Sequence, residues 1–249
     1  MRIAALYDIH GNLPALEAVL AEVDQADVDQ IVVGGDVLIG PLPNESLDLL
    51  LNAKLPVSFL YGNCETDVLT ERGGQRSTRI GEQFREIFQW NAKKLSDEHA
   101  QLISNWPGTL QRQIDGLGNV LFCHATPDSD TEIFTRQSPE SRLAPMFAEV
   151  DADVVVCGHT HMQFDRAIGG TRILNAGSVG MPFGKPGAHW MLLGPGVDFR
   201  ITEYDLEAAA TRIKASDYPQ AEQFAEQNVL NRPSEEQMLA AYAAADEEK

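Results

Sequence analysis

The chain has 249 residues, of which 43% are hydrophobic and 22% charged, the composition of an ordinary globular protein with a substantial core. Its formal net charge of −18 argues against nucleic acid as a partner, because binding to phosphates depends on clustered lysine and arginine. No stretch approaches the ~20 apolar residues of a membrane span and the N-terminus lacks a signal-peptide core, so we expect a cytoplasmic protein without a membrane partner.

The first hundred residues alternate short apolar runs with helical patterns. The runs predict strands at 2–7, 30–35 and 55–63, and the patterns predict amphipathic helices at 13–23, 44–53 and 80–95. Asn12 and Asn44 are candidate N-caps. This alternation is typical of an α/β protein with parallel strands. Residues 66–81 are polar and contain Gly73 and Gly74, and we expect them to form a solvated loop or a mobile lid.

After Trp106 the pattern changes to hairpins. Paired runs flank Gly116 and Gly118, and a second pair has Gly169 and Gly170 at its turn. The remaining elements are a helix at 139–150, a buried strand at 153–161 and two strands within 189–205. We expect two sheets packed face to face with helices outside.

We divide the chain into a domain at 1–205 and a helical C-terminal extension at 206–249, packed on the same domain. Pro219 and Pro233 separate the extension into three helical segments. Residues 205–249 carry ten acids and four bases, which favours a solvated face. The extension could cap a site or pair two copies of the chain as a homodimer.

Three cysteines, Cys64, Cys123 and Cys157, are far apart and odd in number, so neither a disulfide framework nor a cysteine zinc site is indicated. Cys123 and Cys157 fall inside apolar runs, and we expect both to be small buried residues.

Polar side chains follow most of the expected strands. Loops at the carboxyl ends of strands are where α/β proteins build their sites, so these side chains are expected at one edge of the molecule. Seven of them are potential ligands of one shared metal site, namely Asp8, His10, Asp36, Asn63, His124, His159 and His161.

The order D-x-H, G-D, G-N, H and G-H-x-H, followed by "NAGSVGMP" at 175–182, resembles the calcineurin-like metallophosphoesterase superfamily, and within it the small bacterial and archaeal phosphodiesterase-like branch. The resemblance covers about residues 2–180. It implies a four-layer α/β/β/α sandwich of two mixed sheets with outer helices.

The resemblance also implies two divalent metal ions as cofactors. Asp8, His10, Asp36 and His161 would hold one, and Asp36, Asn63, His124 and His159 the other, with Asp36 bridging. Nitrogen and oxygen ligands without thiolate suit Mn²⁺, Fe, Co²⁺ or Zn²⁺ better than Ca²⁺ or Mg²⁺, and manganese is the expectation that we favour. A hydroxide between the metals would attack phosphorus in line with the leaving oxygen.

Cys64 stands where many superfamily members have the histidine of G-N-H-[DE], although the small phosphodiesterase-like branch also has cysteine there. A neutral thiol is a poor proton donor to an alkoxide, and losing general acid help typically costs ~10²–10⁴-fold in rate. Cys64 would then favour substrates whose leaving groups need little protonation. A packed apolar residue and a redox-sensitive thiolate are the alternatives. Glu65 would hold the loop or lie exposed in a turn.

We expect Asp36, Asn63, Cys64 and His124 to be the catalytic residues. Three arginines near Gly73 and Gly74 offer positive charge for phosphate oxygens, and Asn12 lies near His10 in the sequence. The predicted substrate contacts are Asn12, Arg72 and Arg76, with Arg79 as the third arginine.

We expect a dinuclear-metal-dependent phosphodiesterase that hydrolyses a small diester partner, such as a cyclic nucleotide. A phosphomonoesterase or protein phosphatase and a dinucleoside polyphosphate hydrolase are the enzymatic alternatives. A metal-binding regulatory protein with little turnover is the alternative from another class.

Overall fold

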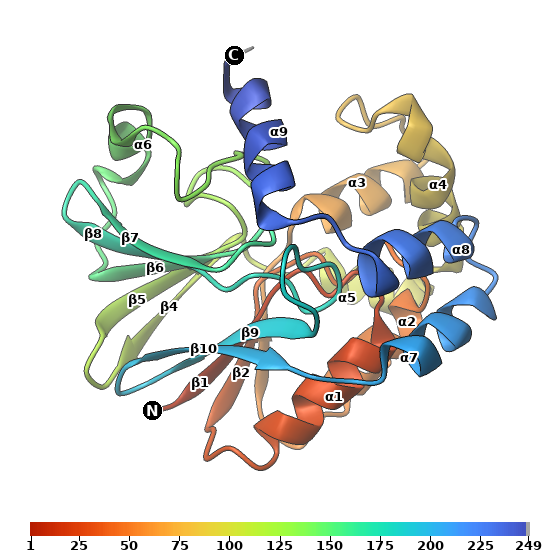
Figure 1. Cartoon of the computed structure of the whole chain (residues 1–249), viewed down its shortest axis with the longest axis horizontal. Coiled ribbons are helices and arrows are strands. Elements are labelled where there is room, and N and C mark those ends of the chain that lie inside the picture. The colour runs from red at the N-terminus through yellow and green to blue at the C-terminus, as the bar shows by residue number, and fades with distance from the viewer. Residues whose placement is uncertain (248–249) are drawn as a thin grey trace.

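Two five-stranded sheets form the centre of the computed structural model, which describes residues 1–247 (Figure 1). The first sheet has the order β10 (Val197–Thr202), β9 (Ala188–Leu193), β1 (Ile3–Leu6), β2 (Gln30–Val33) and β3 (Val57–Phe59). The second has the order β4 (Thr109–Ile114), β5 (Gly118–Cys123), β6 (Val154–Cys157), β8 (Thr171–Asn175) and β7 (Phe164–Ile168).

Both sheets are mixed. β1, β2 and β3 run parallel, as the alternation of strands and helices predicts, and β9 pairs antiparallel with β1. In the second sheet β5, β6 and β8 run parallel, while β4 and β7 pair antiparallel at the two edges. The two predicted hairpins are therefore confirmed as β4–β5 and β7–β8.

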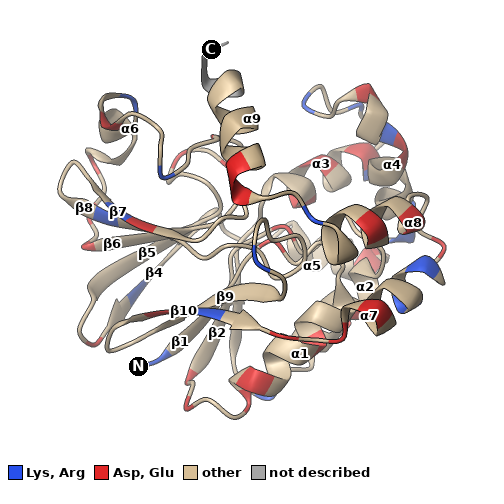
Figure 2. Ribbon diagram, viewed as in Figure 1, with Lys and Arg blue, Asp and Glu red and all other residues tan. Residues whose placement is uncertain are grey.

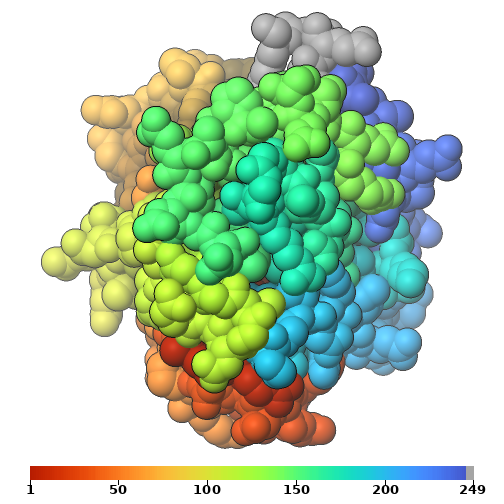
Figure 3. Space-filling view, turned by 90° about the vertical axis from the view of Figure 1, so that its left-hand side faces the viewer, coloured from red at the N-terminus to blue at the C-terminus, as the bar shows by residue number. Residues whose placement is uncertain are grey.

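Three apolar clusters separate four layers. Side chains such as Ile3, Tyr7, Phe122 and Val156 fill the space between the sheets. A larger cluster lies between the first sheet and its helices, and a smaller one lies between the second sheet and α6 (Glu140–Phe147). Figure 3 shows the side of the molecule formed by the second sheet and α6. The expected α/β/β/α sandwich with outer helices is confirmed.

The helices that flank the first sheet include three that the sequence predicts, at 13–23, 44–53 and 80–95, and two that it does not, at Asn63–Arg72 and Asp97–Ile103. They are α1 (Leu13–Val23), α2 (Pro43–Leu51), α3 (Asn63–Arg72), η1 (Glu82–Phe84), α4 (Arg85–Lys94) and α5 (Asp97–Ile103). Asn12 caps α1, since its Oδ1 accepts the N–H of Ala15. The N-cap prediction for Asn44 is wrong, because Pro43 already occupies the first helical position, where proline's missing N–H costs nothing.

The expectation of a loop at 66–81 is wrong for its first part. Residues up to Arg72 continue α3, and irregular chain begins only at Gly73. Glu65, at the third helical position, accepts the N–H of Gly62 at 2.8 Å, which satisfies a donor that the helix itself cannot.

The C-terminal residues fold back over the first sheet's helices. They form α7 (Leu206–Lys214), α8 (Ala221–Phe224), the π-helical segment η2 (Ala225–Leu230) and α9 (Glu235–Glu247). Ile213, Phe224 and Val229 are buried in the same cluster as α1 and α2. Acidic residues are spread along the ribbon, with bases between them (Figure 2). Among the described residues, no helix has both the length and the hydropathy to cross a bilayer.

Candidate metal centre

The turns that follow the strands hold an unusual backbone. Six non-glycine residues within 1–247 have positive φ, and five of them are predicted ligands. These five are Asp8, His10, Asp36, His159 and His161, with φ between 47° and 65°. Such residues avoid this region unless the surroundings impose it, and they concentrate at functional sites. The fold therefore holds these side chains in place against a local conformational cost.

Asp8, His10 and His161 form the first half of the cluster. The two ring Nε2 atoms of His10 and His161 lie 3.2 Å apart, and the Nε2 of His161 lies 3.3 Å from Asp8 Oδ1. All three residues are buried, and one ligand atom from each lies within 4.8 Å of the others.

Asp36, His124 and His159 form the second half with the same spacing of 4.8 Å or less. Asp36 Oδ2 lies 3.6 Å from the Nε2 of His124 and 3.9 Å from that of His10, so this carboxylate faces both halves. The side-chain amide of Asn63 lies 3.1 Å from His124 Nε2 and 3.0 Å from His159 Nδ1. The structure thus brings all seven predicted ligands together.

Two backbone carbonyls orient the imidazoles. His124 Nδ1 donates to Gly34 O and His161 Nδ1 donates to Met181 O, each at 2.9 Å. With Nδ1–H committed to a carbonyl, Nε2 is the nitrogen that faces the cluster, an arrangement found at most metal-ligating histidines.

Unpaired atoms test whether a cation fits. Asp8 Oδ1 is fully buried and receives no well-aligned hydrogen bond, although His161 Nε2 lies 3.3 Å from it, and such a position is costly for a carboxylate. The Nε2 atoms of His10 and His161 face each other at 3.2 Å, and at most one can donate to the other. The side-chain amide of Asn63 has two possible orientations. In one, its N–H donates to the rings of His124 and His159; in the other, its oxygen and the two ring nitrogens could together bind a cation. Two divalent cations would satisfy these atoms, so the donor set fits the metals.

The protein groups alone make an ion-paired cluster. Burial raises the pKa of Asp8 and of Asp36, yet the surrounding imidazoles outweigh it and lower both pKa values. Burial lowers the pKa of His124 and of His161, yet the carboxylates outweigh it and raise both above 6.5. At His159 burial dominates, and the pKa falls to about 4. Metal binding would therefore displace protons from His124 and His161.

Glu65 fastens the turn that carries Asp36 to the start of α3. Its fully buried carboxylate accepts four backbone N–H groups at 2.8 to 3.1 Å, from Gly62, Asp36, Val37 and Leu38. Burial and the Asp36 carboxylate raise the pKa of Glu65 to about 7. The alternative of an exposed turn carboxylate is wrong, and Glu65 is a positioning residue.

Cys64 contacts the carboxylate that faces both halves. Its thiol donates to Asp36 Oδ2 at 3.0 Å and its backbone N–H donates to Asp36 Oδ1 at 2.9 Å. Burial and the charge of Asp36 raise the pKa of the Cys64 thiol well above 9.0. The protein groups therefore keep this thiol neutral, which argues against the redox-sensitive thiolate.

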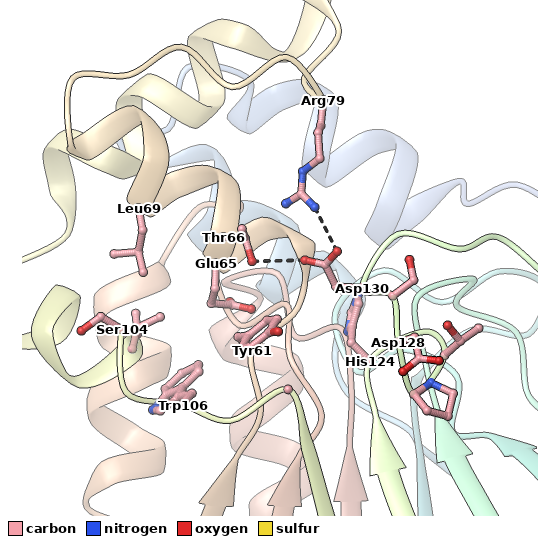
Figure 4. Close-up of a pocket in the computed structure, with 15 residues that line it drawn as sticks. Tyr61, Glu65, Thr66, Leu69, Arg79, Ser104, Trp106, His124, Asp128 and Asp130 are labelled. Atoms are coloured by element: carbon pink, nitrogen blue, oxygen red, sulfur yellow. Dashed lines mark hydrogen bonds and ion pairs between the residues drawn. The ribbon is translucent and has the colours of Figure 1, made fainter. Parts of the chain in front are cut away.

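A first cavity of about 550 Å³ reaches the cluster at His124 (Figure 4). Tyr61 and Trp106 line it on one side and Arg79 on another. Arg79 is held by Asp67 Oδ1 at 3.0 Å and Asp130 Oδ1 at 2.9 Å. Its third contact is the carbonyl oxygen of Asn63, at 3.4 Å.

A second cavity of about 360 Å³ reaches the cluster at five other ligands, which are His10, Asp36, Asn63, His159 and His161, and Cys64 lines it beside them. Its far wall comes from α4 and from the C-terminal segment, including Tyr218 and Phe224. No local sequence signal connects these C-terminal residues with the site, because a helical pattern does not indicate which surface it will cover.

The predicted substrate contacts lie elsewhere. Arg72 pairs with Asp97 and Arg76 with Glu82, and both arginines line a third, surface hollow that contains none of the predicted ligands. Asn12 is fully buried, and its amide caps α1 and donates to Gly180 O. The structure therefore does not bring these three side chains to the cavities at the cluster, and Arg79 is the arginine that it places there.

The chain matches the model of the calcineurin-like phosphoesterase superfamily domain over residues 1–194. It is 27% identical over 239 residues to an uncharacterized protein of Methanocaldococcus jannaschii, covering 88% of this chain and 94% of that protein. A hypothetical protein of Pyrococcus horikoshii has a similar solved structure, with a TM-score of 0.79, 19% identity, and coverage of 94% of this chain and 99% of that one.

A metallophosphoesterase of Sphaerobacter thermophilus has a TM-score of 0.69 and 25% identity, covering 93% of this chain and 99% of that one. The matched family model spans β1 to β9 and includes every residue of the metal cluster. This protein belongs to the calcineurin-like phosphoesterase superfamily.

Proposed function

We propose that the protein is a dinuclear-metal-dependent phosphodiesterase that hydrolyses a small diester. The main support is that two cavities meet at one cluster. The first reaches it at His124, and the second at His10, Asp36, Asn63, His159 and His161. A phosphodiester carries two substituents on phosphorus, and two cavities give each substituent its own space. A monoester would leave one of them unused.

Bound divalent cations, with manganese as the favoured metal, would supply a water-derived nucleophile at neutral pH and offset charge on the phosphoryl oxygens. The chain's own side chains would hold the cations, and the two cavities would limit the size of each substituent. The first ligand set is Asp8, His10, Asp36 and His161, and the second is Asp36, Asn63, His124 and His159. Arg79 lies at the first cavity, close enough to Asn63 to approach a phosphoryl oxygen.

Two observations argue against the alternatives. Cys64 is neutral and donates to Asp36, so it offers little help to the poor leaving group of an alkyl monoester. A dinucleoside polyphosphate needs several positive charges along its phosphates. Arg79 is the one arginine or lysine among the described residues that line the two cavities, and two aspartates already pair with it.

The test compares bis(p-nitrophenyl) phosphate with p-nitrophenyl phosphate. Metal-stripped protein is reloaded in turn with Mn²⁺, Zn²⁺, Co²⁺ and Mg²⁺, and Asp36→Asn serves as the control with weakened metal binding. We expect metal-dependent hydrolysis with a preference for the diester, and loss of activity in the control. A preference for the monoester would contradict the proposal and favour the phosphatase alternative.

A further inference from the structure

The second cavity differs from the first in its chemistry. Beyond the predicted ligands, it is lined by apolar and aromatic side chains together with four side-chain amides, and among the described residues none of these carries a charge. The apolar and aromatic group includes Phe84, Ile87, Phe88, Met181 and Phe224. A group bound here is therefore uncharged, and its volume is limited to a cavity of about 360 Å³, within the usual ~300–1,000 Å³ of small-molecule sites.

The amides come from a short part of the C-terminal segment, where Gln220, Gln223, Gln227 and Asn228 line the cavity. The Nε2 of Gln223 donates to Gln227 Oε1 at 3.2 Å, which leaves the other end of each amide free. In the described part of the chain, no hydrogen bond engages the side chain of Gln220 or Asn228. A side-chain amide offers both donors and an acceptor, so this wall suits a ligand with both kinds of group.

The backbone and the packing favour a built site over an accidental hollow. Gln227 and Asn228 lie on η2, a π-helical segment, and such wide turns are rare and frequent at functional sites. Tyr218 packs edge-on against Trp90 of α4 and against Phe224 of α8. This aromatic chain fixes the amide wall to the body of the protein. Phe84, which also lines the cavity, leaves 49% of its surface exposed, which offers a face for stacking.

We propose that the second cavity binds the base of a nucleotide-like diester, and that the C-terminal segment 218–228 determines this specificity. The proposal rests on the proposed diesterase function and adds the class of one substituent. A nucleobase is flat, uncharged and edged with donors and acceptors, so it can stack on phenylalanine while amides contact its edge. An acyl chain would leave the four amides without hydrogen-bond partners. A sugar phosphate would bring negative charge into a cavity whose described lining residues include no lysine or arginine to pair with it.

The experiment holds the leaving group constant. The Mn²⁺-loaded protein receives the p-nitrophenyl ester of thymidine 5′-phosphate or methyl p-nitrophenyl phosphate, so that only the other substituent differs. Stacking lost on alanine substitution corresponds to roughly a tenfold or larger change in affinity. We therefore expect kcat/KM to be at least ~10-fold higher for the thymidine ester.

The variant Gln220→Ala/Asn228→Ala should remove most of that preference, mainly through KM. The matched control is Glu222→Ala, because Glu222 is exposed in the same C-terminal segment and does not line the cavity. The substrate preference of this variant should equal that of the unmodified chain. A second readout needs no turnover. Saturation-transfer NMR of the metal-free protein should show contacts to thymidine and adenosine but not to ribose, and the double variant should lose them.

The outcomes separate the two proposals. Equal rates on both esters, together with no nucleoside contact by NMR, would overturn the base site and leave the diesterase function standing. Failure of every metal-loaded form to hydrolyse either ester would contradict the diesterase function. In that case nucleoside contact that depends on Gln220 and Asn228 would still support the base site.

Discussion

Cys64 contacts the carboxylate that two metals would share, and its thiol is buried and neutral. At this position a histidine could give a proton to a leaving oxygen, whereas a thiol with a raised pKa cannot do so efficiently. In the proposed enzyme, this one side chain would therefore decide which phosphate esters are hydrolysed.

Cys64→His should raise activity on an alkyl phosphomonoester relative to a diester, because the imidazole can act as a general acid. General acid help is worth ~10²–10⁴-fold, and we expect at least a tenfold change in the ratio of the two kcat/KM values. Metal content should be measured alongside, since the imidazole could also bind a cation. An unchanged ratio at equal metal content would remove Cys64 from the mechanism.

His124 and His161 make metal binding depend on pH. Burial lowers both pKa values, but Asp36 and Asp8 outweigh it and raise them above 6.5. The metal-free protein therefore carries these protons at pH 6.5, and a cation must displace them, so affinity should increase as the pH rises through the raised pKa values. Calorimetric titration with Mn²⁺ in two buffers of different protonation enthalpy should detect proton release at pH 6.5 that diminishes about two pH units higher. Affinity that does not change with pH would contradict this prediction.

Among the elements, the turns after the strands leave no room for side chains. A Cβ at Gly62 would lie 2.2 Å from Asp36 Oδ1 and 2.8 Å from His124 Cε1. Both distances are shorter than the 3.0 Å below which Cβ atoms essentially never approach another heavy atom. The glycine before α3 is thus part of the metal site although it has no ligand atom.

Gly62→Ala should displace Asp36 and His124 and weaken metal binding by more than ~10-fold, since the loss of partners that merely orient ligands already costs 10–100-fold. Equilibrium dialysis with Mn²⁺ measures the effect. Gly196→Ala is the matched control, because a Cβ there meets no atom within 4 Å. Equal metal affinity in the two variants would show that the turn adapts.

The strands were predictable because their apolar, β-branched runs are local signals, and the seven ligands were predictable because they follow those strands. α3 was not, since its residues after Cys64 are mostly polar and its start is fixed by contacts of Glu65 with a turn that is distant in sequence. The position of Gln220 and Asn228 at the cavity was also not predictable from the sequence, because it depends on how the C-terminal segment packs against the rest of the protein.

At the scale of the whole molecule, the C-terminal residues share the main core. Ile213, Phe224 and Val229 are buried together with the helices of the first sheet. The expected boundary between residues 205 and 206 is therefore a division of the sequence. The apolar side chains on its two sides belong to one core.

A chain that ends at residue 205 should lose most of its stability. Burying each of Ile213, Phe224 and Val229 contributes ~1.5–3 kcal/mol, or roughly 5–9 kcal/mol together, comparable with the ~5–15 kcal/mol of a whole domain. Urea unfolding followed by circular dichroism measures the change. A chain that ends at residue 234 is the control, since Leu239 is the one fully described residue of α9 that is buried in the core. A wild-type midpoint for the shorter chain would contradict the shared core.

The position of β1 between β2 and β9 sets an order of events during synthesis. β1, β2 and β3 leave the ribosome early, but one edge of β1 stays open until residue 193 is made, roughly 10–40 s later at ~5–20 residues per second. Asp8 and His159, which are 151 residues apart in the chain, cannot meet before His159 has been made. A nascent chain therefore cannot bring the complete ligand set together before residue 161 has been made, so a metal bound during earlier stages of synthesis would lack two of its histidines.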